Sequence, residues 1–137
     1  MEDKKMMMPA GTYAICDPCY IISDAWAEVC DWCFASDNNG RDGIVPLKDG
    51  RQVAIFGTAY GDGFFEGSDG ECYAVDSGTL GCMLWADCDK DDGDANIVTF
   101  DYDFEVSAKD GVIRIGDITI DTSWPEMDEA ISQRGNI

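Results

Sequence analysis

The chain has 137 residues, of which 45% are apolar and 11% aromatic. This length and composition argue against a disordered chain and support a single domain with its own hydrophobic core. The charge is unusual, because 28 acidic residues against 9 basic ones give a formal net charge of −19 at pH 7. Such a charge disfavours direct binding to nucleic acids or anionic membranes and attracts basic protein surfaces. The alternative interpretation is a surface that is only well solvated.

The chain contains no histidine. This excludes Ser–His–Asp and Cys–His catalysis and every histidine-containing metal site. We therefore expect a non-enzymatic protein without a cofactor, although paired carboxylates can catalyse reactions without histidine. The first residues lack the apolar stretch of a signal peptide, and no apolar segment is long enough to span a membrane. We expect a cytoplasmic protein whose seven cysteines stay reduced.

The N-terminal part of the chain predicts one strand and one helix. Residues 1–10 are expected to form a flexible leader. Thr12–Cys16 alternates as a strand, and Pro18 ends it because proline lacks an amide donor. Cys19–Ile22 is expected to be extended again. Asp24–Phe34 is the predicted helix, because an apolar stripe at helical spacing runs along it: Trp26, Val29, Cys30 and Cys33.

The remainder of the chain predicts antiparallel strands. Turn signals at 48–50, 67–70 and 109–111 separate pairs of apolar or alternating segments, which is typical of hairpins. The predicted strands are Ile44–Leu47, Arg51–Phe56, Phe64–Glu66, Glu71–Val75, Thr79–Trp85, Asn96–Ala108, Val112–Ile115 and Ile118–Thr122. We predict a single α+β domain over residues 11–125, built as a twisted antiparallel β-sheet or open barrel with one amphipathic helix packed on it. Residues 126–137 are predicted to be an acidic tail with room for a short helix.

Two groups of side chains resemble metal ligands. Four thiols in two Cys-x-x-Cys pairs could hold zinc, namely Cys16, Cys19, Cys30 and Cys33. The second pair lies on the apolar stripe of the helix, however, which favours buried core thiols. Closely spaced aspartates could hold calcium, namely Asp87, Asp89, Asp91 and Asp94. Their spacing departs from that of an EF-hand loop, so a solvated acidic loop is the preferred interpretation.

An acidic strand face is the most distinctive pattern. Between 100 and 106, aromatic and apolar residues alternate with Asp101, Asp103 and Glu105, which predicts one face in the core and one face of carboxylates. Two further acids follow: Asp117 just before the last predicted strand, and Asp121 within it. This face could imitate a row of phosphates, or it could be a sheet edge protected by charge. A separate aromatic loop could hold a small molecule, through Tyr60, Phe64 and Phe65.

Segments 11–20, 24–30, 58–65 and 75–81 together resemble a family of small uncharacterised proteins of bacteriophages and prophages. The family is marked by an Asp-Pro-Cys-Tyr motif near the N-terminus, here Asp17–Tyr20. Glycine often stands in the family where this chain has Cys16, which weakens the zinc interpretation. The resemblance implies a phage accessory protein that acts inside the host cell, and it carries no known activity with it.

The leading hypothesis combines the charge with the resemblance. It is a non-enzymatic inhibitor in the host cytoplasm that blocks the basic, nucleic-acid-binding surface of a host protein such as a defence factor, without binding nucleic acid itself. Two alternatives stay open: a structural or calcium-stabilised phage component, and a small-molecule-binding protein.

Overall fold

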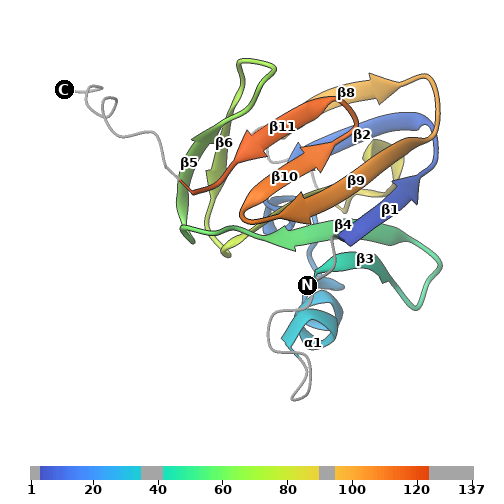
Figure 1. The fold of residues 1–137 in the computed structure, drawn as a ribbon. Helices are drawn as coiled ribbons and strands as arrows, with labels where there is room; N and C mark the ends of the chain where they lie inside the picture. Colours follow the sequence, from blue (N-terminus) through green and yellow to red (C-terminus); the bar gives the residue numbers. More distant parts are fainter. Residues whose placement is uncertain (1–3, 35–41, 90–94, 124–137) are drawn as a thin grey trace.

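The computed structural model describes residues 4–34, 42–89 and 95–123 (Figure 1). The acidic tail predicted over residues 126–137 lies outside this part of the chain. The first half of the chain contributes β1 (Lys4–Met8), β2 (Gly11–Cys16), the 3₁₀ turn η1 (Pro18–Tyr20), helix α1 (Trp26–Phe34), β3 (Gly43–Pro46), β4 (Gln52–Gly57) and β5 (Gly63–Glu66). The second half contributes β6 (Cys72–Val75), β7 (Thr79–Leu84), the 3₁₀ turn η2 (Trp85–Asp87), β8 (Asn96–Phe100), β9 (Phe104–Lys109), β10 (Val112–Ile115) and β11 (Ile118–Asp121).

The described strands form three antiparallel sheets. A five-stranded sheet has the order β3-β4-β7-β2-β8, a four-stranded sheet has the order β1-β9-β10-β11, and β5 pairs with β6. The predicted α+β class with antiparallel sheets and one packed helix is therefore confirmed. The strands divide among several sheets, however, where the sequence suggested one sheet or an open barrel.

The five-stranded sheet is the middle layer of the molecule. One face packs against the four-stranded sheet and the β5–β6 hairpin, and the other face packs against α1 and the segment around η1. The central strands β2, β4 and β7 are consequently buried on both faces. Their sequences are continuous apolar runs, as expected for strands covered on both sides. The outer sheet alternates instead: in β10, Ile113 and Ile115 are buried and Arg114 is exposed.

A bent ribbon joins the two large sheets. β1 pairs with β9 in the outer sheet, and their neighbours in sequence, β2 and β8, pair with each other in the middle sheet. Both segments, β1–β2 and β8–β9, pass from one sheet to the other at the same corner, visible at the right of Figure 1. At this corner the two residues Pro9 and Ala10 lie opposite the three residues Asp101–Asp103, so the second segment has one residue more. The extra residue bends the ribbon, as bulges and breaks do where strands change sheets.

The corner corrects two predictions. Asn96–Ala108 is not one strand, because residues 101–103 turn the chain from β8 into β9. The leader predicted over residues 1–10 contains strand β1, because β9 supplies a pairing partner that the local sequence does not reveal. A third prediction also fails: Cys19 and Tyr20 are not extended, since Pro18 begins a 3₁₀ turn that the Asp17 side chain caps.

The predicted helix and the three predicted hairpins are confirmed. Helix α1 begins at Trp26, two residues later than predicted, and its stripe residues Val29 and Cys33 are buried. The three predicted hairpins form with the expected turns. In the last of them Asp110 and Gly111 have φ values of 55° and 84°, the left-handed conformation that an Asp-Gly turn favours.

Gly81 provides a test of the middle layer. A methyl group at this position in β7 would overlap the carbonyl oxygen of Ala54 in the neighbouring strand. We expect Gly81→Ala to lower the free energy of unfolding by about 3 kcal/mol or more, because backbone atoms cannot move aside as side chains do. Gly57→Ala in β4 is the control, since its nearest neighbour would lie at an ordinary 3.6 Å. Urea denaturation of both variants measures the difference, and equal stabilities would contradict the described packing.

Candidate binding site

A hollow of about 460 Å³ lies at the ribbon corner. Its walls are the end of β8 (98–100), the 101–103 turn, the first residue of β9 and the turn between β10 and β11 (116–117). The hollow is therefore built mainly by the ribbon that joins the two large sheets, and the β10–β11 turn completes it.

Three aromatic rings support the hollow. Phe100 and Phe104 stack with ring centroids 3.8 Å apart, and Tyr13 meets Phe104 edge-on at 4.9 Å. A Cβ on Gly116 would lie 2.5 Å from the ring of Phe100, so only glycine lets this ring cover the turn. The hydroxyl of Tyr13 donates to the carbonyl oxygen of Pro9 at 2.7 Å, which connects the rings to the corner itself.

Three of the five predicted acidic residues line the hollow: Asp101, Asp103 and Asp117. All three are exposed. Asp103 also has a structural role, because its Oδ1 accepts a hydrogen bond of 3.0 Å from the amide of Ala10 in the facing β1–β2 segment. Carboxylates from two separate turns thus meet at one end of the molecule, which lowers the local potential more than any one turn would.

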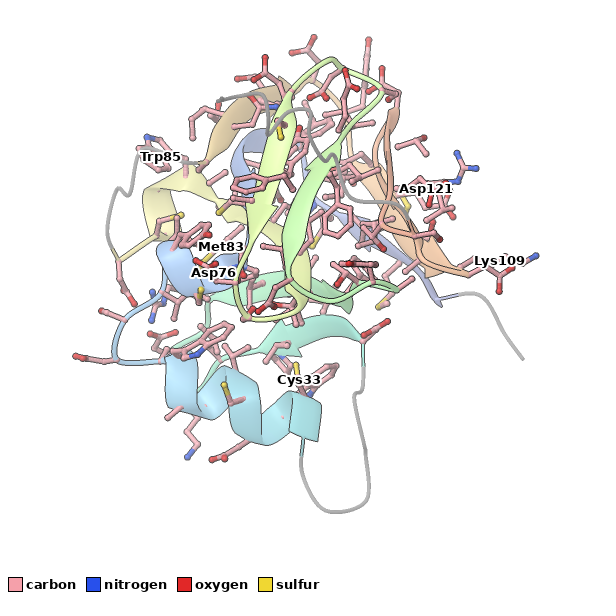
Figure 2. The ribbon with its side chains drawn as sticks, turned by 90° about the vertical axis from the view of Figure 1, so that its left-hand side faces the viewer. Cys33, Asp76, Met83, Trp85, Lys109 and Asp121 are labelled. Carbon is pink, nitrogen blue, oxygen red and sulfur yellow. The ribbon has the colours of Figure 1, made fainter. Side chains whose placement is uncertain are left out.

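Glu105 and Asp121 lie outside the hollow. Glu105 is nearby on β9, where its carbonyl oxygen accepts the amide of Gly116. Asp121 ends β11, four residues and about 13 Å of strand from Asp117. Figure 2 shows Asp121 near Lys109 on the outer sheet, on the opposite side of the molecule from Trp85.

Asp101, Asp103 and Glu105 are exposed as predicted, but the prediction that they form a row along one strand is wrong. The bend interrupts the alternation, so Tyr102 is 82% exposed although the pattern placed it in the core. The exposed face of the outer sheet is also mixed in charge, since Arg114 stands on β10 and donates to Thr119 on β11. Three acids that line the hollow were among the predicted residues, but Tyr102 was not. The signal for Tyr102 in the sequence is its place between two aspartates, where a turn would expose all three side chains.

The side chain of Arg51 contacts the first part of the predicted calcium-binding segment, at Asp87 and Asp89. Its guanidinium donates to Asp89 Oδ1 at 2.7 Å, to the carbonyl oxygen of Asp87 at 2.9 Å and to Asp49 at 2.8 Å. The amide of Ser23 donates to the other oxygen of Asp89 at 2.9 Å, and this bond together with Arg51 lowers the pKa of Asp89. Asp89 therefore already has a cation as its partner. Asp91 and Asp94 lie outside the described residues.

Two of the four cysteines that could hold zinc belong to the core between the middle sheet and α1. Cys16 and Cys33 are buried there, and Figure 2 shows Cys33 on the side of α1 that faces the sheet. Cys19 and Cys30 are half-buried. Burial, with a smaller effect of Asp31, raises the pKa of the Cys30 thiol, which disfavours the thiolate that metals bind. Among the described residues, no three His, Cys, Asp or Glu side chains form a group that could hold a metal ion.

Asp17 is a buried carboxylate that sequence reasoning did not single out as functional. It accepts the amides of Cys19, Asp76 and Ser77 at 3.0, 2.7 and 2.6 Å and the hydroxyl of Ser77 at 2.7 Å. These four donors fill the lone pairs of the carboxylate, so it has no acceptor left for a ligand. Asp17 thus fastens the end of β2 to the β6–β7 turn, which is a structural role.

The aromatic loop does not form one surface. Tyr60 and Phe64 are 59% and 55% exposed, whereas Phe65 is fully buried in the core between the sheets.

The hydroxyl of Tyr73 donates to Asp69 at 2.6 Å and accepts from Asn96 at 2.8 Å, which connects the β5–β6 hairpin to β8.

No protein-family model, curated protein or solved structure matches this chain. Among the described residues, no helix is long and apolar enough to cross a membrane.

The contacts of Arg51 generate a prediction about calcium. We expect added calcium to leave the melting temperature nearly unchanged, because Arg51 already neutralises Asp89. If a calcium site existed, a free calcium concentration of 100 times its dissociation constant would stabilise the protein by about 2.7 kcal/mol. Differential scanning calorimetry with and without calcium distinguishes the two outcomes. A shift of that size, abolished by Asp89→Asn with Asp91→Asn, would establish a calcium site.

Tyr13 and Tyr73 generate a prediction about alkaline pH. Burial raises the pKa of both hydroxyls above the ordinary value near 10. Above that pH the unfolded chain loses protons that the folded chain keeps, so stability should fall by about 1.4 kcal/mol per pH unit for each tyrosine. Tyr73→Phe should make this decline shallower. Urea denaturation across the alkaline range measures the slopes, and an unchanged slope would contradict the burial of this hydroxyl.

Proposed function

We propose that this protein is a non-enzymatic acidic binding protein that occupies the basic, nucleic-acid-binding surface of another protein. The observation that carries the proposal is the corner site, where Asp101, Asp103 and Asp117 surround a hollow beside the exposed ring of Tyr102. The resemblance to bacteriophage and prophage proteins supplies the proposed setting. There, the chain acts as an accessory inhibitor of a host protein such as a defence factor.

Charge and geometry support this proposal together. A net charge of −19 accelerates association with a basic groove, and carboxylates at the contact make that attraction local. One strand spaces its carboxylates about 6.7 Å apart, too far to imitate the phosphates of a duplex, which advance 3.4 Å along each strand. The corner draws acids from two turns, which allows closer and less regular spacing.

The absence of histidine and the state of the buried carboxylate support a non-enzymatic role. Asp17 is the fully buried acid of the described residues, and its acceptors are filled by the protein's own donors. Carboxylate catalysis needs a group that can reach substrate and exchange a proton with it. The acids that reach solvent at the corner are suited to pairing with cations.

The proposal predicts capture and inhibition of a basic protein. The immobilised chain is exposed to the heparin-binding fraction of a bacterial lysate, which is rich in nucleic-acid-binding proteins. We expect salt-sensitive retention of a protein and displacement of DNA from it in a mobility-shift assay. Asp101→Asn with Asp117→Asn should slow association roughly threefold to tenfold.

A matched pair of substitutions provides the control. Asp24→Asn with Asp31→Asn removes the same charge beside and along α1, where both side chains are exposed. This pair should change the rate by less than roughly twofold, because charges far from the contact are screened. Failure to retain any protein, or retention without displacement of DNA, would contradict the proposed function. Equal effects of the two pairs would show that net charge, and not the corner, supplies the attraction.

A further inference from the structure

We infer that the outer edge of β8 and the adjoining corner hollow form one docking groove, which takes an extended, arginine-bearing segment of the partner protein by strand addition. This inference rests on the proposed function and specifies how the partner is held.

The edge of β8 differs from the outer edges at β3 and β11. β3 is four residues long and ends in Pro46, and both features are common protections against strand pairing. The edge of β11 is covered by the β5–β6 turn, where Ser68 exchanges hydrogen bonds with Thr119 at 2.8 and 2.9 Å.

Beyond Asn96, whose side chain donates to Asp69 and Tyr73 of the β5–β6 hairpin, β8 has none of these protections. It ends the five-stranded sheet, and no described strand pairs with its outer side. Its sequence, Asn-Ile-Val-Thr-Phe, contains no charge, proline or glycine and is rich in residues that favour strands. Ile97 is 44% exposed on it. Such an edge presents unpaired amides and carbonyls, which is the surface that strand addition uses.

The hollow continues this edge. Val98, Thr99 and Phe100 of β8 themselves line it, so a segment paired with β8 reaches the acidic corner without leaving the strand. Affinity would then come from main-chain hydrogen bonds, and specificity from the side chain that enters the hollow.

The chemistry of the hollow favours a guanidinium. Tyr102 offers an aromatic face that is 82% exposed, and Asp101 and Asp117 offer carboxylates beside it. Arginine combines stacking on an aromatic ring with forked hydrogen bonds to a carboxylate, whereas lysine is a compact, strongly hydrated charge. A second copy of this chain is a poor occupant, because two chains of charge −19 repel each other.

A peptide titration followed by NMR tests the groove. The probe is a synthetic peptide of alternating valine and threonine with one arginine near its end. We expect saturable amide shift changes confined to β8, the 101–103 turn and the 116–117 turn. A peptide N-methylated on alternate amides should not bind, because it cannot pair with the edge. A citrulline peptide should bind roughly tenfold more weakly, because it keeps the shape of arginine without its charge.

Two tyrosine variants complete the test. Tyr102→Ala should weaken binding of the arginine peptide about tenfold, whereas Tyr60→Ala, at another exposed tyrosine, should leave it unchanged. Absence of saturable shifts, shifts elsewhere, equal binding of the N-methylated peptide, or dimerisation of the chain through β8 would overturn the inference. If a basic protein is captured but the peptide fails, the function stands without this groove. If the peptide binds but no basic protein is captured, the groove stands and the proposed function fails.

Discussion

The bend of the β1–β2 and β8–β9 ribbon is the constraint on which the rest of the structure depends. At this bend two paired segments of the chain pass between the middle sheet and the outer sheet at the same point, so the two sheets must face each other. Pro9 has no amide to pair there, and Asp103 satisfies the amide of Ala10 that the bend exposes. The rings of Tyr13, Phe100 and Phe104 fill the inside of the corner. The same bend turns Asp101 and Tyr102 toward solvent and so creates the candidate site.

The protein uses several of its many carboxylates as internal acceptors. Asp17 collects four donors at the end of β2, Asp69 accepts from the hairpin and from β8, and Asp89 joins Arg51 to the segment before α1. Each of these acids connects elements that are distant in sequence. A negative charge is stabilised where several donors converge on it, which is why a strongly acidic chain can still fold compactly. The acids at the corner are different, because Asp101 and Asp117 are exposed to solvent.

Local pattern predicted the elements well where neighbours in sequence are also neighbours in space. The three hairpins and α1 follow from turn residues and periodicity, which act within about ten residues. The layer order was also encoded: β2 and β4 are continuous apolar runs, and β10 alternates, which distinguishes a strand buried on both faces from one half-exposed. The sequence suggested one sheet or an open barrel, and the pairing of the strands divides them between a middle and an outer sheet.

The sequence alone determined an acidic, histidine-free, mostly antiparallel β domain with one helix, and it identified the acids at 101, 103 and 117. Only the tertiary structure decided that Asn96–Lys109 bends into two strands, that Lys4–Met8 is a strand, and that Tyr102 stands in solvent beside those acids. The physical reason is that pairing between distant segments sets where a strand can continue. The pattern Phe-Asp-Tyr-Asp-Phe is compatible with a straight strand and with a corner. Its pairing with the Pro9–Ala10 break, more than ninety residues away, selects the corner.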